Sequence, residues 1–367
     1  MEGILFIIFL CSAALLVAYY LLVLLASRGR KTTRNAREDA EGISVVVVSR
    51  NGLENLRALI PSLLAQKHLK FEIVVVNDRS FDNTEIFIKS VQRNYPTVLH
   101  MATIPLDTTY PWAGKKFAIA MGVKAAKYDR IVLLDNTAVP AGERWLEAMA
   151  RAFEGDRKEF LIGCTAAGNK GGLYTASEFC RMADYMAWAG AGMPFSARPS
   201  NFGFRKSTFL ARNGYMKDMR VPAGEADFLL QDCATGKNTA IVCSRDALVT
   251  DNSAFTAAEC RERDVARYAA FRHYLLSARA KALTAPFLKA LFLVAAVACG
   301  VFFWPRWEYW AALAVPMALS WVTGWVCARR FVYPRWMALG ILLDVVLLPW
   351  DMIRLTVASA LLPKGWK

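Results

Sequence analysis

The chain has 367 residues, of which 55% are hydrophobic and 21% charged, and its mean hydropathy is +0.26. This composition excludes a disordered chain, which buries too little apolar surface to fold. It also excludes a protein embedded in a membrane throughout, because the long apolar runs lie at the two ends of the sequence. The 45 Lys and Arg against 31 Asp and Glu give a net charge of +14. Such an excess suits anionic lipid heads, phosphate-bearing ligands or nucleic acid, and does not choose among them.

The eight cysteines and three histidines do not have the spacing of a metal site. No two cysteines form a C-x-x-C pair, and several lie in apolar stretches. Isolated cysteines in apolar surroundings are typical of reduced, packed thiols. The sequence therefore predicts neither a zinc site nor a disulfide framework for Cys11, Cys164, Cys180, Cys233, Cys243, Cys260, Cys299 and Cys327.

Residues 3–26 form one apolar run of the length that a helix needs to cross a bilayer. The run is longer than the apolar core of a secretion signal, so we interpret 1–27 as an N-terminal transmembrane anchor. A basic juxtamembrane linker, 28–42, follows with Arg28, Arg30, Lys31, Arg34 and Arg37. Because basic flanks remain on the cytoplasmic side, the chain that follows Ala26 is predicted to lie in the cytoplasm. A cleaved secretion signal is the alternative.

The central part of the chain alternates strand and helix patterns. Residues 43–49, 71–77 and 130–134 are apolar runs rich in β-branched residues, which are typical of buried parallel strands. Residues 53–66 and 82–94 have the spacing of amphipathic helices. This β-α-β-α-β order predicts a doubly wound sheet with right-handed crossovers.

Polar residues follow each predicted strand, at the sheet edge where such folds bind ligands. They are Ser49-Arg50-Asn51, Asn77-Asp78-Arg79-Ser80 and Asp135-Asn136-Thr137. Neither a G-x-G-x-x-G nor a G-x-x-x-x-G-K-[ST] motif occurs, so the sequence carries neither a dinucleotide fingerprint nor a phosphate-binding P-loop.

The C-terminal part, 276–367, is predicted to be a membrane region with two or three spans. Residues 283–304 and 309–327 are apolar, and Arg329, Arg330 and Arg335 follow on the side that the charge rule assigns to the cytoplasm. The last segment, 336–362, is interrupted by Asp344, Asp351 and Arg354 and by Pro349. It is either a span with an interfacial return or a hairpin.

An ordered set of segments resembles family 2 glycosyltransferases, whose fold is called GT-A. The set begins with ISVVVVSRNGLENLRALIPSLLAQ at 43–66 and FEIVVVNDRSFDNT at 71–84, and continues with GKKFAIAMGVKAAKYDRIVLLD at 114–135 and NTAVPAGERWLEAM at 136–149. NFGFRKSTF at 201–209, GEADF at 224–228 and DVARY at 264–268 follow in the family's order. The resemblance covers 43–275, and the arrangement with terminal spans is similar to membrane-bound bacterial members.

The resemblance implies an α/β GT-A domain with a doubly wound, mostly parallel sheet, flanked by transmembrane helices. It implies an inverting transfer of a sugar from a nucleotide-sugar donor, with a UDP-sugar favoured, to the hydroxyl of a glycan or lipid-linked acceptor. The enzyme would lie in the bacterial inner membrane, among its lipids, with the catalytic domain in the cytoplasm. A nucleic-acid partner is not expected, because the basic residues lie beside apolar spans.

The donor side of such a site must hold a nucleoside and neutralise a diphosphate. The resemblance assigns the uracil or ribose to Asp78, and further nucleotide contacts to Arg50 and Asn51. It assigns the diphosphate to Lys115 and Lys116, whose point charges suit phosphate oxygens. A strand-end cap is the alternative for Asp78, and a solvated lysine pair for the two lysines.

The family's metal motif, Asp-x-Asp, is altered in this sequence. It reads Asp135-Asn136-Thr137, so the first carboxylate is present and a hydroxyl replaces the second. A neutral hydroxyl binds Mg²⁺ or Mn²⁺ less well than a carboxylate, so the affinity for metal is expected to fall. The resemblance gives Asp135 and, more weakly, Thr137 as metal ligands.

The acceptor side and the general base follow later in the chain. The family places the acceptor near a stretch that matches Asn201 and Arg205. Its acidic cluster matches Gly224-Glu225-Ala226-Asp227, where Asp227 is expected to be the base and Glu225 its neighbour, with the reverse register left open. Close carboxylates raise one another's pKa, which suits a base. A cap for the helix that begins near Phe228 is the alternative.

The last motif of the family, Gln-x-x-Arg-Trp, is also altered. Asp264-Val-Ala-Arg267-Tyr268 is the nearest match, and Arg267 is expected to bind the leaving diphosphate. Arg267 also belongs to a basic stripe that anionic lipid would attract, formed by Arg261, Arg263, Arg267, Arg272, Arg279 and Lys281. The three altered motifs favour a second hypothesis, a degenerate non-catalytic protein that binds nucleotide and partners an active enzyme.

Overall fold

The computed structural model describes residues 2–29, 41–67, 70–106, 114–153, 158–168, 172–253 and 256–363. Four of the basic residues that we expected in the linker, Arg30, Lys31, Arg34 and Arg37, lie outside these ranges.

Helices and strands alternate through the central domain. The strands are β1 (Ile43–Ser49), β2 (Phe71–Asp78), β3 (Leu99–Ile104), β4 (Arg130–Asp135), β5 (Ala138–Pro140), β6 (Phe160–Gly163), β7 (Thr165–Ala167), β8 (Phe202–Arg205), β9 (Thr239–Val242) and β10 (Val249–Asp251). The domain's α-helices are α2 (Leu53–Leu64), α3 (Thr84–Asn94), α4 (Lys115–Ala125), α5 (Trp145–Phe153), α6 (Leu173–Gly190), α7 (Lys206–Ala211), α8 (Glu225–Cys233) and α9 (Ala257–Phe271).

The remaining helices belong to the two ends of the chain. They are α1 (Glu2–Ser27), α10 (Leu276–Phe303), α11 (Trp307–Arg330) and α12 (Ile341–Ala360). Short 3-10 turns lie at Pro199–Asn201, Met216–Asp218, Arg245–Ala247 and Arg335–Leu339.

The main sheet has seven strands in the order β3-β2-β1-β4-β8-β6-β9. The first four run parallel, and β8 runs antiparallel to both of its neighbours. Because β1 and β2 are almost continuous in valine and isoleucine, both of their faces are buried. Helices α2, α3 and α5 pack on one face, and α4 and α6 on the other. The prediction of an α/β fold with a mostly parallel sheet is confirmed.

The sequence analysis predicted β1, β2 and β4 of this sheet and missed its other four strands, β3, β6, β8 and β9. β3 lies at the sheet edge, between α3 and α4 along the chain, and most of its side chains are only partly buried. An edge strand needs no continuous apolar run, because one side of its ladder has no neighbour. A second sheet of three strands, β5-β10-β7, stands beside the end of β4.

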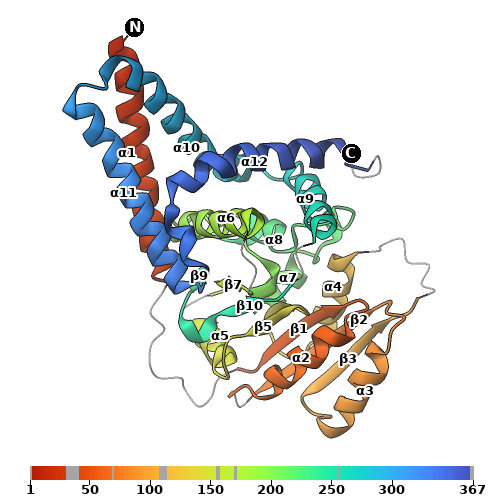
Figure 1. Ribbon diagram of the computed structural model, residues 1–367. Helices are drawn as coiled ribbons and strands as arrows, with labels where there is room; N and C mark the ends of the chain where they lie inside the picture. The colour runs from red at the N-terminus through yellow and green to blue at the C-terminus, as the bar shows by residue number, and fades with distance from the viewer. Residues whose placement is uncertain are drawn as a thin grey trace.

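Within the part of the chain that the structure describes, three helices are long and apolar enough to cross a membrane: α1, α10 and α11. They extend together away from the central domain (Figure 1). Phe9 and Leu16 of α1 pack against Phe292 of α10 and Tyr309 of α11 in one apolar cluster.

The last segment, for which the sequence left open a span with an interfacial return or a hairpin, contains the helix α12. It is a single helix through Pro349 that lies across α6 and α9 instead of joining the bundle (Figure 1). Its Ala358 packs on Val265 and Ala269 of α9. Arg354 also donates hydrogen bonds to Asp264 of α9 at 2.8 Å and to Ser177 of α6 at 3.0 Å.

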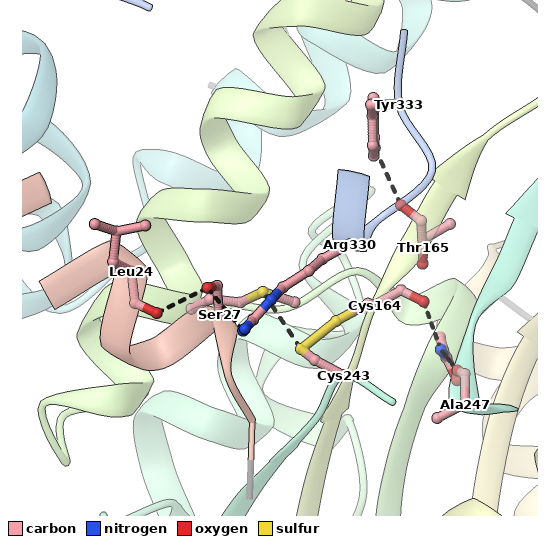
Figure 2. Close-up of a disulfide and its surroundings, with 10 residues drawn as sticks. Leu24, Ser27, Cys164, Thr165, Cys243, Ala247, Arg330 and Tyr333 are labelled. Carbon is pink, nitrogen blue, oxygen red and sulfur yellow. Dashed lines mark hydrogen bonds between the residues drawn. A yellow bond between two sulfur atoms is a disulfide. The ribbon is translucent and has the colours of Figure 1, made fainter. Parts of the chain in front are cut away.

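The expectation that all cysteines are reduced and unpaired is wrong for two of them. Cys164 and Cys243 form a disulfide, with their Cα atoms 5.5 Å apart. Each cysteine directly follows a strand, and Gly163 of β6 is the register partner of Val242 of β9, so strand pairing brings the two together. Figure 2 shows this bond near the ends of α1 and α11. The two cysteines are 79 residues apart in the sequence, so their spacing gave no indication of the pairing.

A buried ion pair joins α12 to α10, one of the candidate membrane spans. Lys289 of α10 donates to Asp344 of α12 at 2.7 Å, and both side chains are almost fully buried. Removing one partner leaves a buried charge uncompensated. We expect Lys289→Met to lower the free energy of unfolding by about 3–5 kcal/mol, measured as thermal unfolding in detergent.

The double variant Lys289→Met/Asp344→Leu is the matched control, because it removes both charges. It should recover most of the lost stability. A double variant that is as unstable as Lys289→Met would contradict the assignment of the loss to an uncompensated charge.

Candidate active site

A cavity of about 840 Å³ lies between the carboxyl ends of the parallel strands and the layer formed by α6, α9 and α12. Eight of the residues predicted from the sequence line it, and they come from six different elements or their ends. They are Arg50, Asp78, Lys115, Asp135, Thr137, Glu225, Asp227 and Arg267.

The parallel register explains why the donor-side residues meet. Ser49 at the end of β1 is paired with Asn77 of β2, and Val48 with Asp135 of β4, so the residues that follow these strands share one edge. Asp78 is buried there, and its Oδ1 lies 2.7 Å from a guanidinium nitrogen of Arg79.

Lys115 begins α4 and forms an ion pair with Asp135. Burial disfavours the lysine's charge, but the carboxylates of Asp135 and Glu225 outweigh this effect and raise its pKa. The lysine therefore stays cationic beside the cavity, where a diphosphate would need a positive charge.

Oxygen ligands for a divalent cation are present at the end of β4, but they are few. Asp135 supplies one carboxylate, and the Thr137 hydroxyl donates to Asp251 Oδ1 at 3.0 Å. Among the described residues, no group of three or more His, Cys, Asp or Glu side chains is close enough to hold a metal ion. The site therefore fits Mg²⁺ or Mn²⁺ only if the donor's phosphate oxygens complete the coordination.

Asp227 occupies the first turn of α8, which begins after Gly224 in the left-handed region at φ 88°. Its Oδ1 accepts hydrogen bonds from the Ser196 hydroxyl at 2.7 Å and from the Ala197 amide at 3.4 Å. Its Oδ2 accepts from the Tyr274 hydroxyl. The carboxylate is thus held in one orientation at the junction between the sheet edge and α9.

Burial raises the pKa of Asp227, and the hydrogen bonds from Tyr274 and Ser196 oppose the rise. We expected the neighbouring Glu225 to raise this pKa, and the largest cause of the rise is desolvation. A raised pKa brings a carboxylate closer to the range in which it works as a base.

Arg267 of α9 forms a bidentate pair with Glu178 of α6, donating to Oε2 at 2.7 Å. Glu178 is 3% exposed. Burial opposes its charge, but Arg267, Arg181 and Arg198 together hold its pKa well below the ordinary value. Arg198 in turn lies 2.9 Å from Asp251 Oδ2. This pairing positions Arg267 at the cavity wall instead of in a lipid-facing stripe.

Two residues predicted on the donor side do not line the cavity. Asn51 bridges two loops: its backbone N–H donates to Ser80, and its Oδ1 accepts from the Phe81 N–H at 2.9 Å. Lys116 is buried and donates to the carbonyls of Asp218 and Val221. Burial lowers the pKa of Lys116 to about 8.

The two residues predicted on the acceptor side also lie away from the cavity wall. Asn201 is fully buried, donating to the carbonyls of Cys164 and Ala247. Arg205, at the end of β8, pairs with Asp129 at 3.0 Å. Because β8 runs antiparallel to β4, the end of β8 lies at the sheet edge opposite to the cavity.

The sequence analysis missed several residues that build the cavity, namely Glu178, Asp184, Ser196, Arg198, Asp251 and Tyr274. Glu178 and Asp184 had a signal, since each is an acidic residue within an otherwise largely apolar helix. Ser196 and Tyr274 had none, because their role arises from contacts with Asp227 across 31 and 47 residues of sequence.

The comparisons with known proteins agree with this geometry. Residues 44–216 match the model of the family described as glycosyl transferase family 2. Poly-beta-1,6-N-acetyl-D-glucosamine synthase of Staphylococcus aureus (strain COL) is 29% identical over 102 residues, which are 28% of this chain and 23% of that protein. The synthase of Staphylococcus epidermidis is 27% identical over 106 residues, which are 29% of this chain and 24% of that protein. These matches span less than a quarter of the curated relatives.

A solved structure shares the fold over nearly the whole chain. The mannosyltransferase PcManGT of Pyrobaculum calidifontis, in complex with GDP-Man and Mn²⁺, superposes with a TM-score of 0.50 at 15% identity, covering 94% of this chain and 99% of that one. The family match spans the strands and loops that build the donor side of the cavity. Residues 44–216 match glycosyl transferase family 2, and the central domain that contains them has the GT-A fold.

Proposed function

We propose that the protein is a membrane-anchored glycosyltransferase that moves a sugar from a nucleotide-sugar donor, a UDP-sugar by preference, to an acceptor hydroxyl on a glycan or lipid-linked acceptor. One observation carries the proposal. Asp78, Lys115, Asp135 and Asp227 line a single cavity at the carboxyl ends of parallel strands. In doubly wound sheets this edge is where nucleotides bind.

The residues divide into donor and acceptor roles. Asp78 accepts hydrogen bonds from the nucleoside, with Arg50 at the same rim, and Lys115 and Arg267 neutralise the diphosphate. Asp135 with Thr137 would hold Mg²⁺ or Mn²⁺ against the diphosphate, and the metal would add positive charge there.

Asp227 is the general base of the proposed reaction. The acceptor hydroxyl oxygen bonds to the anomeric carbon while its proton passes to a carboxylate oxygen of Asp227. The bond from the anomeric carbon to the diphosphate oxygen breaks, and the nucleoside diphosphate leaves with that electron pair. Attack from the side opposite to the leaving group inverts the anomeric centre.

We propose that the domain faces the cytoplasm at the bacterial inner membrane, with α1, α10 and α11 as spans. Arg28 follows α1 directly, and Arg329 and Arg330 end α11, so both domain-side ends carry positive charge. The Cys164–Cys243 disulfide favours the opposite side, because disulfides are rare in reducing compartments. We base the proposed orientation on the basic ends of α1 and α11. The protease experiment below tests this orientation against the one that the disulfide favours.

Nucleotide sugars should stabilise the purified protein, and Mn²⁺ should increase the effect. A thermal-shift panel of UDP-, GDP- and CDP-sugars with and without Mn²⁺ is expected to give its largest shift with a UDP-sugar and Mn²⁺. A ligand at about 100 times its Kd stabilises by about 2.7 kcal/mol. Asp135→Asn should abolish the Mn²⁺-dependent part. A panel without any shift would contradict the proposed function.

Asp227→Asn should reduce sugar turnover by at least about 100-fold, because it removes the base, while the nucleotide-sugar thermal shift persists. Asp232→Asn is the matched control. It lies at the far end of α8, where Asp232 pairs with Arg212, and should retain turnover. A wild-type protein that binds UDP-sugars without turnover would instead favour the degenerate binding protein.

Tyr274→Phe should move the acidic limb of the kcat/KM–pH profile to higher pH. The hydroxyl stabilises the charged form of Asp227, so its loss raises the pKa of the base further. We expect a shift of about one pH unit, the equivalent of one hydrogen bond to a charged group. Tyr268→Phe, on the preceding helix α9, is the control, because the described hydrogen bonds to Asp227 come from Tyr274, Ser196 and Ala197. An unshifted limb in Tyr274→Phe would exclude Asp227 as the titrating base.

Protease added to intact spheroplasts should leave the domain uncut, and protease added to inverted membrane vesicles should cleave it. Opposite results would place the domain outside the cytoplasm, where the disulfide would be expected to form.

A further inference from the structure

The cavity continues past Asp227 toward the membrane helices. On the side of α9, α10 and α12, its wall includes Phe271 of α9, Ala282 and Leu283 of α10, and Leu355 and Ala358 of α12. We call this part the acceptor arm. Asp227 stands where the arm meets the donor side, because it bonds both Ser196 and Tyr274.

The arm ends at surfaces suited to lipid. Leu283 lies in the first turns of α10, a candidate membrane span. Exposed apolar side chains extend along α12, among them Met352, Ile353 and Leu355, with Leu355 48% exposed. A helix with one face on the protein and apolar side chains on the other is typical of the membrane interface.

The charges on the arm disfavour an anionic head. Asp184 is 8% exposed, and its Oδ1 has no hydrogen-bond partner among the residues that the structure describes. Burial raises the pKa of Asp184 to about 7. Arg181 and Arg354 are each paired with a carboxylate within 3.5 Å. A phosphate group would be repelled by the carboxylates of Asp184 and Asp227, and the neighbouring Arg181 and Arg354 are already engaged in ion pairs.

We propose that the acceptor is a membrane lipid with an uncharged, hydroxyl-bearing head, whose apolar chains leave the acceptor arm between α10 and α12. The inference rests on the proposed function and names its acceptor. An acceptor hydroxyl must lose a proton, which Asp227 can take, whereas a phosphate oxygen needs no base. A second head hydroxyl can donate to Asp184 Oδ1. A water-soluble glycan would leave the apolar wall of the arm uncovered.

The test uses the full chain in phosphatidylcholine nanodiscs. Dioleoylglycerol is added as the hydroxyl lipid, and a polyprenyl phosphate or a soluble oligosaccharide is added in parallel. UDP release is followed from the UDP-sugar that gives the largest thermal shift. We expect dioleoylglycerol to accelerate release at least about tenfold. Acceleration by the polyprenyl phosphate alone or by the oligosaccharide alone would overturn the inference and leave the proposed function intact.

A second readout is independent of turnover. A diacylglycerol analogue with a diazirine in its acyl chain should label α9 at the peptide that contains Phe271, which lines the arm. Leu355→Trp narrows the arm and should reduce this labelling at least about fivefold. It should reduce the ratio of lipid-stimulated to lipid-independent UDP release by the same factor. Ile353→Trp, on the same helix but absent from the cavity wall, should change neither.

The labelling also decides the case in which no acceptor accelerates release. Label at the Phe271 peptide that Leu355→Trp removes supports the inference. Labelling that is confined to the outer faces of α10 and α12 overturns the inference. Labelling of the Phe271 peptide that is equal in Leu355→Trp and Ile353→Trp also overturns it. Failure of the proposed function is recognised separately, because the nucleotide-sugar thermal shift needs no acceptor.

Discussion

A chain of buried ion pairs connects the membrane-side helices to the edge of the sheet. Arg267 of α9 is held by Glu178 of α6, Glu178 lies 3.7 Å from Arg198, and Arg198 pairs with Asp251 at 2.9 Å. Asp251 accepts a hydrogen bond from the hydroxyl of Thr137, which lies two residues after Asp135. An unpaired charge that is buried at this depth would lower the free energy of unfolding, so each charged side chain of the series is stabilised by the next one. The chain of contacts thus joins α9 and α6 on one side of the cavity to the end of β4 on the other.

The same chain explains how altered family motifs coexist with an ordered site. Thr137 replaces a carboxylate, but its hydroxyl is bonded to Asp251, which belongs to another sheet. In the motif that contains Arg267, Asp264 replaces the family's glutamine and Tyr268 its tryptophan, yet Glu178 orients Arg267 bidentately. Positive charge near the proposed diphosphate position is thus maintained by tertiary contacts that a linear motif does not record.

Much of the architecture follows from local patterns. The valine-rich runs 43–49 and 71–77 are predicted within one residue of β1 and β2, because both faces of a central parallel strand are apolar. The placement of Asp78 and Asp135 at one edge follows from the parallel order of their strands. The assignments of Asn201 and Arg205 to the acceptor side could not be checked from the sequence, because β8 runs antiparallel and its direction depends on strand pairing.

The sequence by itself determined the apolar helices at both ends, the α/β class and the polar residues that follow the strands. These depend on composition and periodicity, which are local properties of the chain. Tertiary structure alone decided the Cys164–Cys243 pairing, the burial of Glu178 among three arginines and the orientation of α12 across α9. Each of these joins residues far apart in the sequence. The free energy of such a contact depends on burial and distance, and neither can be read from spacing along the chain.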